Sequence, residues 1–172
     1  GGLTISNTQD DGIRMSGGSG LTLNGVTFNG IGNGDNDDGM QLDNVSGTVS
    51  IQDSVFNNVA EEMVEVNQLN TNMTMNVNNT TFTQPNTLAG IRAAGAFAGN
   101  GLLFTLSGSS NLVLDVTNST FTDIKGSGIQ VGGTGTPLPD ESLEDSDLIL
   151  PPADATLEEV RELLSDEGLI PG

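Results

Sequence analysis

Several residue types that carry common catalytic and metal-binding chemistry are missing from this chain of 172 residues. It contains no Cys, His, Trp or Tyr, and its aromatic side chains are six Phe. Without Cys and His the chain can form no disulfide, no Cys- or His-ligated metal centre and no nucleophilic triad that needs either residue. Without Trp and Tyr it also lacks the larger aromatic side chains that commonly form the platform of a sugar-binding cleft.

Positive charge is scarce as well. Four Lys and Arg residues stand against 23 Asp and Glu, which gives a net charge of −19. Such a charge opposes binding to nucleic acid or to an anionic membrane. No apolar run approaches the length of a membrane span. We therefore expect no nucleic-acid partner and no membrane insertion, and an extracellular or cell-surface location, where salt and calcium screen the acidic charge.

What the chain does contain is a repeated pattern of short strands. Triplets alternate between an inward, an outward and an inward side chain, as side chains on a β-strand do. The first triplet of each repeat is Ile13–Met15, Met40–Leu42, Val64–Val66, Ile91–Ala93 or Ile129–Val131. The second is Leu21–Leu23, Val49–Ile51, Met75–Val77 or Leu114–Val116, with Leu3–Ile5 as an incomplete first copy. Five residues after each full second triplet stands Phe28, Phe56, Phe82 or Phe121.

The spacing of the repeats indicates one β-coil per repeat. The first triplets follow one another at steps of 27, 24, 27 and 38 residues, and self-similarity on this scale is typical of solenoids. The longest step predicts an insertion at 96–113, with Leu102–Leu106 as an extra strand. An antiparallel sandwich with Asn-rich turns is the alternative, but it gives no reason for three aligned ladders.

These features resemble the right-handed parallel β-helix of the pectate-lyase-like superfamily over residues 1–135. In that family a turn between two strands often carries a stacked asparagine. Three residues before each Phe this chain has Gly25, Asp53, Asn79 or Asn118, and Asn7 fits the first copy. Asn and Asp tolerate left-handed backbone geometry, which suits a tight turn. We expect an all-β, right-handed parallel β-helix (solenoid) of about five coils, belonging to a longer secreted or cell-surface protein.

The composition changes after residue 135. Residues 136–155 combine four Pro with six acidic residues and predict an extended acidic linker. Residues 156–168 predict a short amphipathic α-helix, with Thr156 and Glu159 as a capping box and Gly168 at its end. Because so short a helix is marginal alone, we expect it to cap the solenoid or to dock to a partner or a neighbouring domain.

The outward row of the first triplets is the face that carries ligands in the resembled family. We therefore take this row as the candidate substrate-binding surface: Arg14, Gln41, Glu65, Arg92 and Gln130. The alternative is a ladder that satisfies itself, with Glu65 beside Arg92.

Pairs of acidic residues precede three of these triplets in the same register. Their carboxylates would stack at the sheet edge, where like charges repel unless a cation or a proton intervenes. Ca²⁺ takes oxygen ligands and tolerates irregular loops better than Mg²⁺. The candidate metal ligands are Asp10, Asp11, Asp35, Asp37, Asp38, Glu61 and Glu62. Solvated carboxylates splayed apart at loop tips are the alternative.

No catalytic constellation is assembled in the sequence. It therefore favours a non-catalytic segment with a structural, adhesive or carbohydrate-contacting role, whose partner is a polysaccharide or another protein. The alternative implied by the resemblance is a polysaccharide lyase or glycoside hydrolase, with Arg14 or Arg92 as the base and Asp38 among the acidic residues. The chain departs from the polygalacturonase group of that superfamily, which carries a His and an Arg-x-Lys element.

Overall fold

The computed structural model describes residues 2–33, 36–84 and 99–134. The chain divides after Thr136 into two units, and the described residues belong to the first. This described part is all-β, with parallel strand pairing and no helix. The parallel all-β architecture agrees with the sequence prediction and is consistent with a solenoid-like fold. The predicted linker at 136–155 and the predicted helix at 156–168 lie outside the described residues.

The strands form three parallel sheets. The first sheet contains β2 (Ile13–Ser16), β5 (Met40–Asp43), β8 (Val64–Leu69), β11 (Leu102–Ser107) and β14 (Ile129–Thr134). The second contains β3 (Ser19–Asn24), β6 (Ser46–Gln52), β9 (Asn72–Asn78) and β12 (Asn111–Thr117). The third contains β1 (Thr4–Ser6), β4 (Thr27–Ile31), β7 (Val55–Val59), β10 (Thr81–Thr83) and β13 (Thr120–Thr122).

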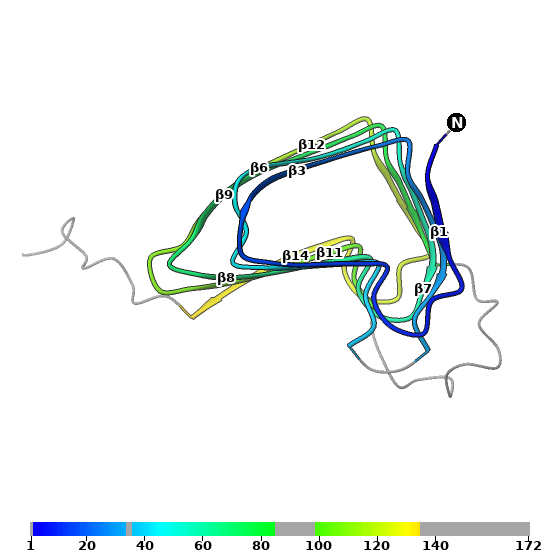
Figure 1. Cartoon of the computed structure of the whole chain (residues 1–172), viewed down its shortest axis with the longest axis horizontal. Coiled ribbons are helices and arrows are strands. Elements are labelled where there is room, and N and C mark those ends of the chain that lie inside the picture. The colour runs from blue at the N-terminus through cyan, green and yellow to red at the C-terminus, as the bar shows by residue number, and fades with distance from the viewer. Residues whose placement is uncertain (1, 34–35, 85–98, 135–172) are drawn as a thin grey trace, which may run out of the picture. The chain divides into compact units, whose positions relative to one another are not determined.

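The chain visits the three sheets in turn, so each circuit forms one coil. The strand groups β2–β3–β4, β5–β6–β7, β8–β9–β10 and β11–β12–β13 each supply one strand to every sheet. In Figure 1 the coils overlie one another, and the strand pairing makes each coil the direct neighbour of the next. The first-sheet strands keep one register, in which Ile13, Met40, Val64, Leu102 and Ile129 align.

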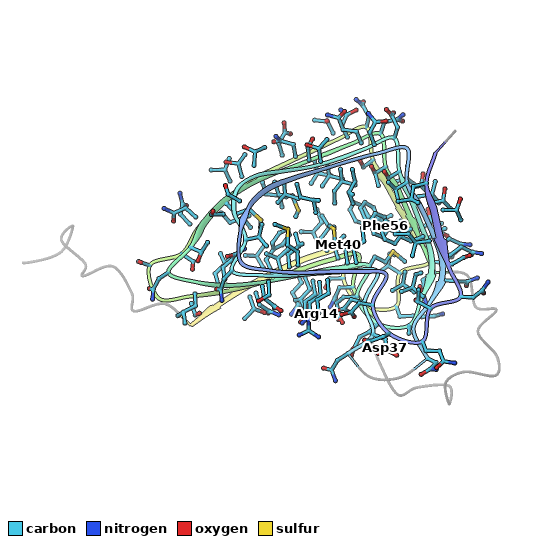
Figure 2. All side chains as sticks on the ribbon, viewed as in Figure 1. Arg14, Asp37, Met40 and Phe56 are labelled. Atoms are coloured by element: carbon cyan, nitrogen blue, oxygen red, sulfur yellow. The ribbon has the colours of Figure 1, made fainter. Side chains whose placement is uncertain are left out.

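The core is a set of apolar columns inside the coils. Met40 and Phe56, labelled in Figure 2, point into this interior and are fully buried. The rings of Phe28, Phe56, Phe82 and Phe121 stack in one column, with centroid separations of 4.3, 5.0 and 4.7 Å. Aromatic pairs at such separations add about 0.5–1.5 kcal/mol beyond the area they bury, so the column predicted from the sequence spacing holds four coils together.

The turn between the second and third sheets repeats without change. Gly25, Asp53, Asn79 and Asn118 occupy it in successive coils, all with positive φ between 48° and 66°. Nδ2 of the Asn79 side chain donates a hydrogen bond to Oδ1 of Asp53 at 2.6 Å, so side chains bridge adjacent coils. Only Gly, Asn and Asp adopt this backbone conformation readily, which explains why the sequence restricts itself to them here.

Two details of the N-terminal segment differ from the sequence prediction. Ile5 pairs with Phe28, so Leu3–Ile5 belongs to the third sheet rather than to the second. Consequently Asn7 directly follows β1 and aligns with Gly30 and Asn58, which lie within β4 and β7 and also have positive φ. The triplet pattern does not separate these sheets, because both present aliphatic residues inward.

The predicted position of the insertion is also wrong. Leu102 pairs with Val64 on one side and Ile129 on the other, so β11 is the regular first-sheet strand of its coil and not an extra one. Ile91–Ala93, the triplet predicted for that place, lies outside the described residues. The additional residues lie between β10 and β11, and include 85–98, which are outside the described residues.

The stacked column predicts a large stability loss on truncation of its central ring. Phe56→Ala should lower the free energy of unfolding by about 3–5 kcal/mol, because Phe56 is fully buried between two rings and the cavity cannot close. Leu69→Ala, at an exposed side chain, should change it by less than about 0.5 kcal/mol. Urea denaturation of both variants checks this, and equal losses would contradict it.

Candidate functional site

The outward row of the first sheet differs from the predicted one at its fourth position. Glu65 pairs with Leu103, and Leu103 pairs with Gln130. Leu103 thus takes the place predicted for Arg92, which lies outside the described residues, because the added residues between β10 and β11 shift the triplet. The predicted neighbour relation between Glu65 and Arg92 is therefore absent from this row. An apolar side chain interrupts the polar strip that the sequence suggested as a substrate-binding surface.

Arg14, at the start of this row, lies beside two carboxylates. Its guanidinium nitrogens are 3.8 Å from Oδ2 of Asp11 and 3.6 Å from Oδ2 of Asp43. The side chain is 60% exposed, and Figure 2 shows it outside the coil interior. Exposed pairs at such distances add little stability. Arg14 is therefore an exposed surface cation that forms ion pairs with two carboxylates.

The corner that joins the third sheet to the first carries a column of polar side chains. Asp11, Asp38, Glu62 and Asn100 occupy equivalent positions, each two residues before the start of its first-sheet strand. The Asp38 amide donates to Oδ1 of Asp11 at 2.8 Å, and the Glu62 amide donates to Oδ1 of Asp38 at 3.1 Å. Asn100 continues the column by donating from Nδ2 to Oε1 of Glu62 at 3.2 Å. Side chains of one coil thus bind the backbone or side chains of the next.

Small residues explain why these carboxylates lie so close to the core. Gly12, Gly39 and Gly101 follow Asp11, Asp38 and Asn100 in the sequence. A Cβ on Gly39 would lie 2.4 Å from the Met63 carbonyl oxygen and 3.0 Å from the Phe56 ring. The backbone therefore approaches the phenylalanine column as closely as glycine permits, and it draws the preceding side chain inward with it.

Burial is the feature that the sequence did not reveal. Asp38 is 1% exposed and Glu62 is 8% exposed, so the central carboxylates are not solvated loop tips. Asp37 is also buried, and its Oδ2 accepts a hydrogen bond from the Asn33 amide at 2.7 Å. Figure 2 places Asp37 in the loop at this corner. Ionised carboxylates in such positions need a counter-charge or a proton.

One group of carboxylates is close enough to share a cation. Ligand oxygens of Asp38, Glu61 and Glu62 lie within 4.8 Å of one another. The amide of Asn36 donates to Oε2 of Glu61. Of the other predicted ligands, Asp10 is exposed, Asp11 lies one coil away beside Arg14, and Asp35 is outside the described residues. The structure thus brings together three of the predicted metal ligands.

The electrostatics of Asp38 reflect this crowding. The pKa of Asp38 is raised to about 9, mainly by burial. The negative charge of Glu65, its hydrogen bond with Asp38 and then the charge of Glu62 raise it further. Sequence reasoning placed Glu65 in the substrate row and did not connect it with Asp38. The two carboxyl groups come close because the chain turns at Gly39, just before β5. The alternation of side chains along a strand does not predict this proximity.

The flanking members of the column are affected in the same direction. Burial raises the pKa of Asp11, and the hydrogen bond from the Asp38 amide opposes the rise. Burial and then the charge of Glu61 raise the pKa of Glu62. In each case loss of solvent is the main cause, so the column is a buried acidic strip with incomplete charge compensation.

Comparison with protein-family models gives a match to the C-terminal part of the chain. A protein-family model described as PspA-Associated protein matches residues 117–172, which is less than half of the chain. The match begins at the end of β12 and includes β13 and β14. The chain matches none of the curated proteins and none of the solved structures with which it was compared. No described segment forms a helix of the length and apolarity that a bilayer crossing requires.

This match overturns the predicted function. The sequence suggested a secreted or surface segment with a structural, adhesive or carbohydrate-contacting role, or else a polysaccharide lyase or hydrolase. The matched family is described by association with another protein, and no match supports the pectate-lyase-like superfamily. Both predicted roles are therefore wrong. Extracellular or cell-surface location and calcium binding stay predictions.

The raised pKa of Asp38 predicts a specific pH dependence. Asp38 titrates at about 9 in the folded state, against an ordinary value of 3.8, so folding favours its protonated form. Its contribution to stability is complete below pH 4 and is lost as the pH rises towards 9. In chelator, the free energy of unfolding should fall over this range by up to about 1.4 kcal/mol per pH unit.

Asp38→Asn removes this titration and should flatten the fall. Asp115→Asn, at an exposed carboxylate of β12, removes the same charge and should leave the slope unchanged. Denaturant titrations at several pH values, at constant ionic strength, measure the slopes. Equal slopes in Asp38→Asn and the unmodified protein would show that Asp38 is ionised throughout.

Proposed function

We propose that this chain is a protein-association component whose C-terminal part binds a PspA protein. The observation that carries the proposal is the family match at residues 117–172, since that family is described as PspA-associated. The coils that precede the match would then act as the rigid support for a binding segment. The proposal concerns recognition and assigns no reaction to the chain.

The described start of the matched segment has the properties of a contact surface. Among the described residues, β12, β13 and β14 each pair with a neighbour on one side only. Ile129 and Val131 continue the inward columns of the first sheet, yet they are 41% and 55% exposed. Unpaired strand edges and exposed apolar side chains favour association with another polypeptide.

The remaining matched residues supply further candidate contacts. Residues 156–168, predicted from their sequence to form an amphipathic helix, fall within the match. They lie outside the described residues, so their contribution rests on the sequence pattern alone. The net charge of −19 additionally favours a partner surface rich in Lys and Arg, because complementary charge steers association.

We also infer that the coils form a right-handed parallel β-helix. The strand order supports coiling through three parallel sheets, and crossover connections between parallel strands are right-handed in nearly all proteins. In such solenoids each coil contacts only its neighbours. A terminal coil can therefore present its free face to a partner while the coils behind it keep their packing.

The test is direct binding between the full-length chain and a purified PspA protein. Isothermal titration calorimetry should give saturable binding. Val131→Glu and Leu163→Glu each place a charge on an apolar position of the matched segment and should weaken binding at least tenfold. Leu69→Glu makes the same change at an exposed position outside the match and should bind as the unmodified chain does.

Two results would contradict the proposal. The first is the absence of saturable binding by a chain that circular dichroism shows to be folded. The second is binding that Leu69→Glu weakens as much as Val131→Glu and Leu163→Glu do, which would place the contact outside the matched residues.

A further inference from the structure

We propose that Asp38, Glu61 and Glu62 form a binding site for a divalent cation, with Ca²⁺ as the expected ion. The three side chains come from the corner before β5 and the corner before β8, which belong to adjacent coils. Each offers a carboxylate oxygen within 4.8 Å of the other two. The site is independent of the association proposed above, because it lies outside residues 117–172.

Unpartnered buried oxygens distinguish this cluster from an ordinary acidic surface. Oδ2 of Asp38 is buried and accepts no hydrogen bond from a donor among the described residues. The Glu65 carboxyl lies within hydrogen-bonding reach of Asp38, but it supplies a donor only if one of the two groups is protonated. Oε1 of Gln41 is also buried without a partner. In the preceding coil Arg14 contacts Asp11, which lies three residues before it in the sequence. Gln41 aligns with Arg14 and likewise follows Asp38 by three residues, so the register places Gln41 beside Asp38. A bound cation would satisfy both of these unpaired acceptor oxygens.

Hydrogen bonds already orient each of the three carboxylates through one of its oxygens. Oδ1 of Asp38 accepts from the Glu62 amide, Oε1 of Glu62 accepts from Nδ2 of Asn100, and Oε2 of Glu61 accepts from the Asn36 amide. These bonds leave Oδ2 of Asp38 for the ion. Ligands held by outer hydrogen bonds in this way bind metal more tightly, because their orientation is fixed in advance.

The chemistry of the ligands favours Ca²⁺. All the available atoms are carboxylate or amide oxygens, which suit hard cations. They come from two corners of unequal length, which favours Ca²⁺, because Ca²⁺ accepts irregular sets of six to eight oxygens whereas Mg²⁺ requires a near-ideal octahedron. A bound divalent ion would neutralise most of the charge of three carboxylates and join two coils.

The experiment is thermal unfolding of the full-length chain, followed by circular dichroism, with CaCl₂, with MgCl₂ or with chelator at one ionic strength. Ca²⁺ at a hundredfold excess over its dissociation constant should raise the melting temperature by about 5–10 °C. Calorimetric titration with CaCl₂ should show one saturable site. Mg²⁺ should give a smaller shift.

The variants separate a specific site from general screening of the negative charge. Asp38→Asn should fold in chelator and lose the shift with Ca²⁺. Glu62→Gln should lose it too, and provides the test if Asp38→Asn does not fold. Asp115→Asn should keep the full shift.

Three outcomes would overturn the proposal. Equal melting temperatures in CaCl₂ and chelator, without binding heat, would mean that no ion binds. Equal Ca²⁺ shifts in Asp38→Asn and Asp115→Asn would mean that the ion acts elsewhere. An Mg²⁺ shift as large as that with Ca²⁺ would remove the assignment to calcium.

Discussion

The stacking of the phenylalanine rings is the contact on which the alignment of the coils depends. Each ring lies 4.3–5.0 Å from the next and is close to parallel with it. A shift of one residue between coils would turn a ring out of the core and expose it, so one register is strongly preferred. Because that register is shared by every column, it also determines which side chains meet in the left-handed turns and which carboxylates stack at the corner.

The same alignment creates an electrostatic problem at the acidic corner. Repetition places one carboxylate above another, and the glycines beside the rings draw Asp38 out of solvent. Burial costs an ionised group several kcal/mol unless a partner compensates it. Backbone amides and Asn100 compensate part of the charge, and the remainder must be met by a proton or by a cation.

Much of this arrangement could be predicted from the sequence, and the exceptions have physical reasons. Alternating triplets and the Phe spacing gave the parallel all-β architecture, because each depends only on the local period of a strand. The sequence could not show which residue follows Glu65 in the outward row of the first sheet. Ile91–Ala93 and Leu102–Phe104 are equally good strand triplets, and only the strand pairing decides between them. Burial of Asp38 could not be predicted either, because it arises from the close approach of Gly39 to the Phe56 ring.

The largest differences in coil length lie at one corner, between the third sheet and the first. From the second sheet to the third, strands end and begin at Asn24 and Thr27, Gln52 and Val55, Asn78 and Thr81, and Thr117 and Thr120. From the third sheet to the first the intervals vary, from Val59 to Val64 in one coil and from Thr83 to Leu102 in another. Lengthening a surface loop costs little free energy. Evolution could therefore change the sequence and length of the segments around the carboxylates freely. The apolar columns and the constant turns between the second and third sheets would keep the scaffold unchanged.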